Sequence, residues 1–387
     1  MKNIYLQILE NQSGNTPLAL ATVVSTSGST PQKPGSSAIF NKNGLVTGTV
    51  GGGIVEGKVQ RIAVDSIASK ESGLFSFNLA NDIADKEDAI CGGQISVLVD
   101  ANLNNYIDVF EQIRKSLEER IPGVLITMVT RFNEKSVLIN RYWMSSNFKP
   151  GIPVEFFEKI EPVVNILLEA GDPSDFRQME LSISGEEPSS TFYLEPVFPL
   201  RKLIIAGAGH IGKSLSHLGN MLGFEVTVID DRSEYANSEN IPDASHIIVG
   251  DIGKAMHDIK KGDDTYVVIV TRGHKDDAEA LKPCIGSEVA YTGMIGSRKK
   301  IAAMRSHFIE QKWATAKQWD SVYAPVGIDI KSQTVEEIAV SIAAQLVMVK
   351  NSRPSSLKLR RLKEDGRPKP EVRNPKSDPD SYRDRNK

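Results

Sequence analysis

The amino-acid sequence predicts an α/β protein: a mixed α+β N-terminal domain followed by a Rossmann-like, doubly wound parallel sheet. Residues 203–231 read as an apolar strand, a glycine turn, a helix, a second strand and an acidic end. Strands and helical segments continue to alternate after that unit. The chain of 387 residues exceeds the usual size of one domain, about 100–200 residues. We therefore expect domains at 1–196 and 197–350 and a tail at 351–387.

The N-terminal domain is expected to begin with a short helix over Lys2–Glu10. Segments rich in Val, Ala and Thr, separated by turn residues, predict strands at 18–25, 37–40, 45–50 and 94–100. Apolar residues recur at helical spacing over 54–69. The pattern then predicts a helix at 106–117 and strands at 124–130 and 136–139. Pro196 and Pro199 predict a turn that ends the domain near residue 197.

In the second domain, short apolar segments predict strands at 203–206, 225–229, 246–249, 266–270 and 289–291. Thr334 is expected to cap the last helix, with Glu337 as its capping-box partner. Five prolines and many charged side chains follow Ser352, a composition typical of a disordered tail.

The composition of the chain argues against several classes of protein and of partner. Hydrophobic residues make up 40% of the chain and charged residues 25%, as in ordinary globular proteins. The absence of an apolar segment of about 18 residues argues against a membrane partner and favours a cytoplasmic protein. The net charge is −3 and the basic surplus lies in the tail, so we expect no nucleic-acid partner. Two cysteines, Cys91 and Cys284, are too few for a disulfide framework or a cysteine metal site, and no metal ligands are predicted.

The glycine turn of residues 203–231 predicts a nucleotide site. Glycines in G-x-G-x-x-G spacing follow a strand and open a helix, so backbone N–H groups and the helix dipole attract a phosphate. An acidic pair follows 18 residues after the last glycine, near the distance of about 20 expected for a carboxylate that binds ribose. The predicted ligand-binding residues are Gly207, Gly209, His210, Gly212, Asp230 and Asp231.

Further candidates follow the next two strands of this domain. The carboxyl ends of parallel strands form the edge at which such sheets bind ligands. Arg272 and His274 follow one strand, and Gly296 and Arg298 follow the next. They are candidate anion contacts, and an ordinary loop histidine is an equally good interpretation of His274.

Three loops of the N-terminal domain also favour ligand binding. Small hydroxyl side chains and glycine fill the loop 25–35, and three consecutive glycines precede the helix at 54–69. A third loop places a thiol beside two glycines. Ordinary turns and a buried cysteine are the alternative interpretations. The candidates are Gly28, Ser29, Gly51, Gly52, Gly53, Glu56, Cys91, Gly92 and Gly93.

These stretches resemble the XdhC/CoxI family, accessory proteins of molybdenum hydroxylases such as xanthine dehydrogenase. The resemblance rests on ATVVSTSGSTPQKPGSSAIF, GLVTGTVGGGIVEGKV and CGG, and on LIIAGAGHIGKSLSHLGNMLGFEVTVIDDR, VVIVTRGHKDD, YTGMIGSRKK and PVGIDIKSQTVEEIAVSIAAQL. It implies a chaperone, rather than an enzyme, that binds molybdenum cofactor as molybdopterin or its dinucleotide form. The cofactor would be handed to an apo molybdenum hydroxylase after sulfuration, with a cysteine desulfurase as a further partner.

The chain departs from the family pattern at two positions. Ile54 stands where the family often has cysteine, which puts direct sulfur or metal handling in doubt, and Arg272 stands where it often has histidine. Two alternatives stay open: an NAD(P)-dependent oxidoreductase that uses the Rossmann domain, and a nucleotide-sensing regulatory protein. A homodimer is expected by analogy with dimeric client enzymes alone.

Overall fold

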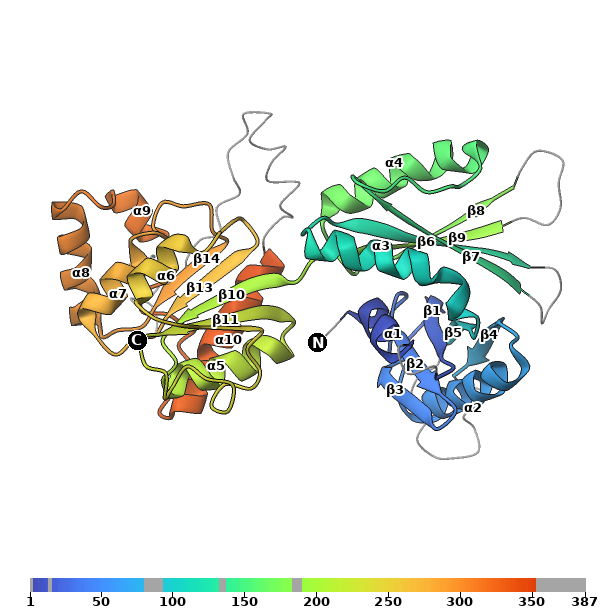
Figure 1. Cartoon of the computed structure of the whole chain (residues 1–387), viewed down its shortest axis with the longest axis horizontal. Helices are drawn as coiled ribbons and strands as arrows, with labels where there is room; N and C mark the ends of the chain where they lie inside the picture. The colour runs from blue at the N-terminus through green and yellow to red at the C-terminus, as the bar shows by residue number, and fades with distance from the viewer. Residues whose placement is uncertain (1–2, 13–15, 80–92, 132–136, 183–189, 353–387) are drawn as a thin grey trace, which may run out of the picture. The chain divides into compact units, whose positions relative to one another are not determined.

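The structure is a computed structural model that describes residues 3–12, 16–79, 93–131, 137–182 and 190–352. The chain divides into two compact units, Lys2–Pro199 and Leu200–Lys387 (Figure 1). The expected disordered tail lies outside the described residues from 353 onward. No helix in the described ranges has the length and apolar character needed to cross a membrane.

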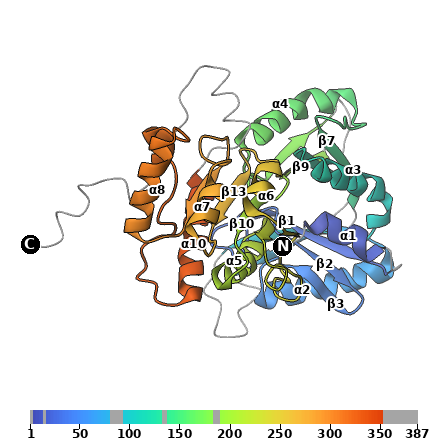
Figure 2. The ribbon, with the colours of Figure 1, turned by 60° about the vertical axis from the view of Figure 1, so that its left-hand side comes forward.

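The first sheet of the N-terminal unit is antiparallel, with the order β3-β2-β1-β5-β4. Helix α2 (Gly53–Ser69) packs along one face of this sheet (Figure 2), where Val55, Val59 and Ala63 meet the buried side chains of the strands. The strands are β1 (Ala19–Ser27), β2 (Ser37–Asn41), β3 (Gly44–Gly48), β4 (Gly73–Asn78) and β5 (Gln94–Asp100).

The second sheet of this unit is also antiparallel, with the order β7-β6-β9-β8. Helices α1 and α3 share a core with both sheets, in which Tyr5 and Phe110 stack at 5.8 Å, and α4 covers the other face of the second sheet. The elements are α1 (Ile4–Gln12), the 3-10 helix η1 (Leu103–Tyr106), α3 (Ile107–Glu118), β6 (Gly123–Arg131), β7 (Val137–Ser145), α4 (Val154–Ala170), β8 (Arg177–Leu181) and β9 (Ser190–Val197).

The prediction of a turn from Pro196 to Pro199 is wrong at Pro196. Pro196 lies inside β9 and is paired with Val124 of β6. On the other side of β9, the pairing with β8 ends at Leu194, before Pro196 is reached. Pro196 therefore needs no backbone N–H for a hydrogen bond to β8.

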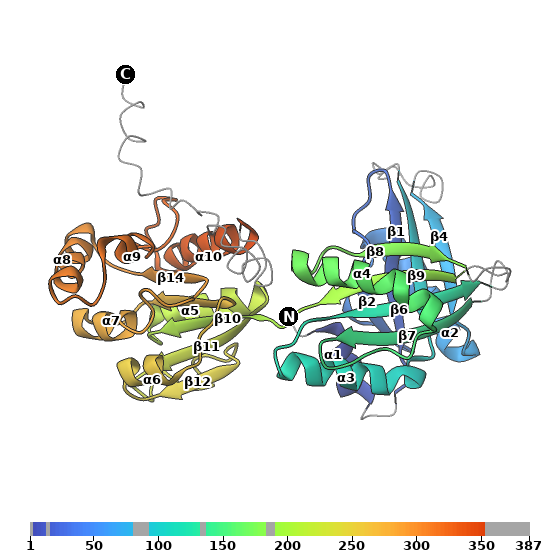
Figure 3. The ribbon, with the colours of Figure 1, turned by 90° about the horizontal axis from the view of Figure 1, so that it is seen from above.

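The C-terminal unit holds a five-stranded parallel sheet with the order β12-β11-β10-β13-β14, which confirms the predicted Rossmann fold (Figure 3). Strand β10 is central. The next two strands in the sequence, β11 and β12, lie on one side of it, and β13 and β14 lie on the other. Parallel sheets of this kind bind ligands where the strand order changes side, here between β10 and β13. The strands are β10 (Arg201–Ala206), β11 (Phe224–Asp230), β12 (His246–Val249), β13 (Thr265–Ile269) and β14 (Tyr291–Met294).

Helices cover both faces of this sheet because successive strand residues point to opposite sides. Leu203 and Ile205 join a core with α5 and α10, whereas Ile204 and Ala206 join a core with α6, α7, α8 and α9. The helices are α5 (His210–Met221), α6 (Ile252–Asp258), α7 (His274–Leu281), α8 (Arg298–Glu310), α9 (Ala316–Asp320) and α10 (Val335–Ser352).

Two local expectations for this unit have different outcomes. The capping box of α10 is confirmed: the N–H of Glu337 donates to Thr334 Oγ1 at 3.2 Å, and the N–H of Thr334 donates to Glu337 Oε2 at 3.1 Å. The strand predicted at 289–291 instead spans Tyr291–Met294, where Tyr291 pairs with Tyr266 of β13. The apolar Val289 and Ala290 belong to the preceding turn, because pairing with β13 sets the register.

Candidate functional site

The glycine turn leaves the carboxyl end of β10, and each glycine has a separate steric role. Gly207 adopts a φ of +115°, and a Cβ there would lie 2.5 Å from the carbonyl oxygen of Val270. A Cβ on Gly212 would lie 1.9 Å from the carbonyl oxygen of Gly207, so α5 approaches the turn too closely for any side chain. A Cβ on Gly209 would meet nothing within 4 Å. Gly209 therefore leaves open space beside the backbone, as a bound phosphate requires.

Two helix N-termini at this edge have no side-chain cap. Helix α5 begins after Gly209, and α7 begins after Gly273, with no cap hydrogen bond in either case. At the other described helices of the unit, the side chain of the residue before the helix caps its N-terminus. These capping residues are Asp251, Ser297, Thr315 and Thr334. Because α5 and α7 follow the neighbouring strands β10 and β13, their free N–H groups and dipoles are available to one anion at the same edge.

The acidic pair at the end of β11 is divided by the structure. Asp230 is 2% exposed and accepts hydrogen bonds from the N–H of Ala208 at 2.8 Å and from Arg232 Nε at 2.8 Å. Burial alone would raise the pKa of Asp230, but the hydrogen bonds from Arg232 and Ala208 bring it below its ordinary value. Asp231 is exposed, and its Oδ2 lies 2.7 Å from Arg272 Nη2. Asp230 is thus used inside the fold, and Asp231 is the carboxylate that a ligand can reach.

The remaining candidates at this edge have different surroundings. His274 and Arg298 are exposed and are the first residues of α7 and α8. Gly296 contacts protein, since a Cβ there would lie 3.0 Å from Ile301 Cδ1. Beneath the loop, Asp277 is fully buried, accepts a hydrogen bond from Thr271 Oγ1 at 2.6 Å and is paired with Lys300. This contact ties α7 to α8 and holds the exposed side chains of His274 and Arg298 near the edge.

The three glycines at the start of α2 leave open backbone at Gly52 and Gly53. Gly51, Gly52 and Gly53 have φ values of +145°, +66° and +57°, a region that side chains rarely adopt. A Cβ on Gly52 or Gly53 would meet nothing within 4 Å, and α2 has no side-chain cap. Glu56 in the first turn accepts a hydrogen bond from Thr49 Oγ1 at 2.8 Å, so one of its oxygens is held against the preceding loop. The backbone amides at this helix start remain open to an anion.

Described residues from the three predicted loops of this unit lie together. A Cβ on Gly93 would lie 2.5 Å from the carbonyl oxygen of Ser29, so Gly93 packs against the first loop. A Cβ on Gly51 would lie 3.2 Å from Pro31 Cγ, so the second loop also packs against the first. Gly28 and Ser29 are exposed at the first loop's turn. The structure thus brings Ser29, Gly51 and Gly93 to one place, whereas Cys91 and Gly92 lie outside the described residues.

The other cysteine has no ligand-binding character. Cys284 is 2% exposed, and its thiol donates weakly to the carbonyl oxygen of Ala280 at 3.4 Å. Burial raises the pKa of Cys284 to about 12. Among the described residues, no group of three or more His, Cys, Asp or Glu side chains is placed to hold a metal ion.

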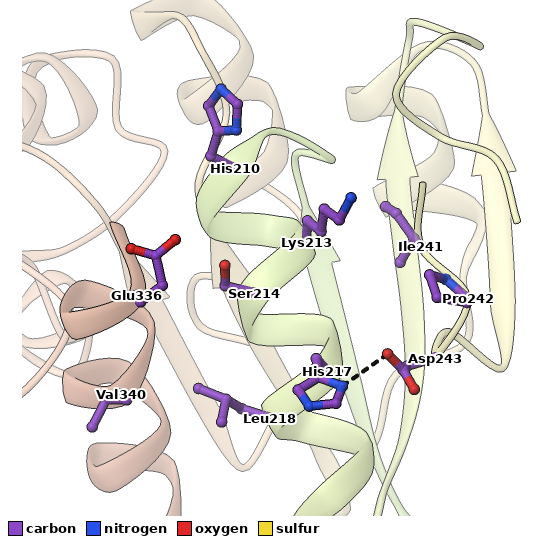
Figure 4. Close-up of a pocket in the computed structure, with 10 residues that line it drawn as sticks. All are labelled: His210, Lys213, Ser214, His217, Leu218, Ile241, Pro242, Asp243, Glu336 and Val340. Carbon is purple, nitrogen blue, oxygen red and sulfur yellow. Dashed lines mark hydrogen bonds and ion pairs between the residues drawn. The ribbon is translucent and has the colours of Figure 1, made fainter. Parts of the chain in front are cut away.

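A cavity of about 580 Å³ runs along α5 (Figure 4). His210, the first residue of α5, lines the cavity directly after Gly209 of the glycine turn, and His217 pairs with Asp243 at 2.9 Å on the cavity wall. Sequence reasoning missed this cavity, although polar residues at positions 210, 213, 214 and 217 follow helical spacing along one face. Its lining residues are His210, Lys213, Ser214, His217, Leu218, Ile241, Pro242, Asp243, Glu336 and Val340.

The parallel sheet, the glycine turn and the uncapped helix starts define a Rossmann-type unit, and the other unit of the chain is α+β. Residues 203–346 match the sequence model of the XdhC Rossmann domain, and residues 12–78 match that of the XdhC and CoxI family. The two matches lie in different units and together span more than half of the chain. The chain belongs to the XdhC and CoxI family.

Curated relatives and a solved structure agree with this assignment. The chain is 24% identical to a Bacillus subtilis protein named as a probable xanthine dehydrogenase component, over 89% of this chain and 95% of that protein. It is 23% identical to the uncharacterised protein YqeB of Escherichia coli over 92% of this chain, and it spans only 48% of YqeB's length. A crystal structure described as a xanthine dehydrogenase from Bacillus halodurans has the same fold, with a TM-score of 0.70, 24% identity and coverage of 92% and 99% of the two chains.

Proposed function

We propose that the protein binds molybdenum cofactor and delivers it to a xanthine dehydrogenase-type molybdenum hydroxylase. The family and the names of two relatives link the chain to xanthine dehydrogenase. The observation that carries the step to cofactor binding is the backbone of Gly52 and Gly53, which has positive φ values, no neighbouring atoms within 4 Å of either added Cβ, and an uncapped helix behind it.

The residues present fit the phosphate of a pterin cofactor. Gly52 and Gly53 offer backbone N–H groups without shielding side chains, and the hydroxyl of Ser29 lies on the loop that packs against the same turn. When bound, the cofactor supplies the metal centre at which the client hydroxylase oxidises its substrate. The chain itself binds and orients the group through these amides.

The chemistry at the start of α2 favours a carrier. Ile54 is 40% exposed and apolar, so this position of the helix offers no thiol to molybdenum or sulfur. Sulfur would therefore come from a separate donor, and a cysteine desulfurase is the class of enzyme that supplies it. The protein acts in this proposal as a chaperone that holds the cofactor between the two enzymes.

The Rossmann unit binds the nucleotide portion of a ligand in this proposal. The open space beside Gly209 and the uncapped starts of α5 and α7 suit a diphosphate, and the exposed carboxylate of Asp231 suits a ribose hydroxyl. A dinucleotide form of the cofactor has both groups. NAD(P) has them too, which is the observation that favours an oxidoreductase or a nucleotide sensor as the second candidate.

The test is equilibrium binding of isolated molybdenum cofactor and of NAD, measured anaerobically with the full chain. We expect tight binding of the cofactor and weaker binding of NAD. Gly52→Val should abolish cofactor binding because its side chain would cover the amides. Gly223→Val is the matched control, since Gly223 also has a positive φ (+76°) and a Cβ there also meets nothing within 4 Å, but it lies in the Rossmann unit. Equal cofactor binding by Gly52→Val and Gly223→Val would refute the N-terminal site. Tight NAD binding without cofactor affinity would assign the chain to the second candidate.

A further inference from the structure

The pair Asp231 and Arg272 crosses the carboxyl edge of the Rossmann sheet. Asp231 follows β11 and Arg272 follows β13, and β10 is hydrogen-bonded between these two strands. Neighbouring strands lie about 4.8 Å apart, so the two loops are separated by about 10 Å at their strand ends. The 2.7 Å contact between Asp231 Oδ2 and Arg272 Nη2 therefore spans the place where the glycine turn leaves β10.

This pair differs from the ion pair next to it. Asp230 and Arg232 share two contacts, at 2.8 and 3.0 Å, with side chains that are 3% and 22% exposed. The Arg232 guanidinium also lies 3.9 Å from the centre of the Tyr235 ring. The side chains of Asp231 and Arg272 are 42% and 55% exposed, and they meet through one oxygen and one nitrogen. The Asp230–Arg232 pair belongs to the fold, whereas the Asp231–Arg272 pair is weak enough to exchange partners.

We propose that Asp231 and Arg272 form an exchangeable pair that selects ligands carrying both a phosphate and a ribose hydroxyl. The proposal rests on nucleotide binding by the Rossmann unit and names how that site chooses its ligand. A phosphate at the glycine turn takes the guanidinium of Arg272, and a ribose hydroxyl donates to the released carboxylate of Asp231. A ligand with both groups replaces both partners of the broken pair.

Ligands with one of the two groups do not replace both partners of the pair, although Asp231 Oδ1 also lies 3.8 Å from Arg232 Nε. Inorganic pyrophosphate takes Arg272 but leaves Asp231 beside an anion, and adenosine approaches Asp231 but leaves Arg272 paired to the same carboxylate. The site therefore binds a nucleoside diphosphate in preference to either fragment. No covalent step is involved, and the proton of the hydroxyl stays on the ribose.

The test uses the full chain with ADP, pyrophosphate and adenosine as probes in isothermal titration. Asp231→Asn releases Arg272, so we expect it to bind pyrophosphate about two- to fivefold more tightly than wild type, the range that an exposed ion pair supports. The same variant should bind ADP more weakly, because the amide is a poorer acceptor for the ribose. In the Arg272→Gln background, Asp231→Asn should raise pyrophosphate affinity less than it does in wild type, because only the repulsion between Asp231 and the anion is then removed.

Two controls separate the exchange from general charge effects. Asp276→Asn removes one negative charge from the first turn of α7 without touching the pair. A gain in pyrophosphate affinity by Asp276→Asn equal to that of Asp231→Asn would overturn the exchange, as would an Asp231→Asn gain of the same size in the Arg272→Gln background. Thermal unfolding of each variant verifies that these exposed substitutions leave the fold intact.

The outcomes also separate this inference from the proposed function. If ADP binds but the double-variant cycle shows no dependence on Arg272, the exchangeable pair is refuted and nucleotide binding stands. If neither ADP nor pyrophosphate binds wild type, the nucleotide site and the exchangeable pair are both refuted. Cofactor binding at Gly52, measured on the same preparation, is then decided independently.

Discussion

The carboxylate of Asp230 accepts a hydrogen bond from the backbone N–H of Ala208 at 2.8 Å, and this contact ties the end of β11 to the middle of the glycine turn. The same carboxylate accepts from the backbone N–H of Arg232 at 3.1 Å. One buried side chain therefore fixes both the turn that would receive a phosphate and the loop that carries Asp231. The geometry of the proposed nucleotide site therefore depends on Asp230, a buried residue.

Asp230→Ala is expected to lower the free energy of unfolding by about 2–3 kcal/mol. The change leaves the Ala208 N–H and the partly buried Arg232 guanidinium without their acceptor. Asp231→Ala should change stability by no more than about 0.5 kcal/mol because that side chain is exposed. Urea unfolding of both variants makes the comparison. Equal losses in the two variants would contradict the division of the acidic pair.

The sequence predicts the glycine turn, but it does not show which carboxylate, Asp230 or Asp231, is buried. The spacing of the glycines and the strand before them predicted the turn, because the chain folds locally there. Which carboxylate turns inward depends on Ala208 and Arg232, two contacts that no periodicity encodes. The Arg272 contact with Asp231 likewise depends on strand order, since the two residues are 41 positions apart.

In the N-terminal unit, some whole helices and strands are predictable from the sequence and others are not. Strand β5 was predicted at its observed bounds, because its short apolar run contains the β-branched residues Ile95, Val97 and Val99, which favour strands. Helix α4 was not predicted, and it contains Pro162, which removes a backbone donor and ordinarily ends a helix. Packing of Phe156, Ile160 and Val164 against the second sheet outweighs that cost. Such packing is visible only in the folded unit.

Gly209 and Gly212 should respond to alanine in opposite ways. Gly212→Ala places a Cβ 1.9 Å from the Gly207 carbonyl oxygen, so we expect a loss of about 3 kcal/mol in stability. Gly209 has an ordinary φ of −68° and open space beside it, so Gly209→Ala should fold normally. Its methyl group stands where a phosphate approaches, and ADP affinity should fall about tenfold, a change of about 1.4 kcal/mol. Calorimetric titration and thermal unfolding separate the two effects, and normal ADP binding by Gly209→Ala would place the phosphate elsewhere.

Lys300→Met should destabilise the C-terminal unit by about 3 kcal/mol. The substitution keeps the length of the side chain but removes the cation from the fully buried Asp277, which keeps its hydrogen bond from the Thr271 hydroxyl. Lys299→Met is the control on the same helix, because Lys299 is exposed and should lose no more than about 0.5 kcal/mol. Denaturant unfolding of both proteins is the measurement. A loss that is the same for both lysines would show that the contact with Asp277 contributes nothing.

Cys284 should resist alkylation in the native protein. Its pKa is raised to about 12 by burial, although nearby Lys261 lowers it, so the reactive thiolate is scarce at about pH 8. Iodoacetamide treatment followed by peptide mass mapping should find Cys284 unmodified until denaturant is added. Modification of Cys284 under native conditions would mean that the core around α7 opens readily.

Glu195 should make the stability of the N-terminal unit fall as pH rises. Burial raises the pKa of Glu195 to about 7, although the hydrogen bond from Tyr5 and the charge of Arg141 act to lower it. The folded state then holds a proton that the unfolded state has already released, so stability should fall as pH rises from about 4.5 to 7 and level off above it. The fall attributable to this residue is about 3 kcal/mol, since one pKa unit corresponds to about 1.4 kcal/mol.

Glu195→Gln and Tyr5→Phe isolate this contribution. The neutral amide of Glu195→Gln cannot titrate, so urea unfolding at pH 5 and pH 7.5 should show its stability advantage over wild type growing toward the higher pH. Tyr5→Phe removes the hydroxyl that donates to Glu195 Oε2 at 2.6 Å, a bond that favours the ionised carboxylate. Its loss should extend the pH-dependent fall in stability to higher pH, because it raises the pKa of Glu195 in the folded state alone. If wild type and Glu195→Gln have parallel stability curves between pH 5 and pH 7.5, Glu195 is already ionised throughout that range, and desolvation in this core is weaker than its hydrogen bond and the field of Arg141.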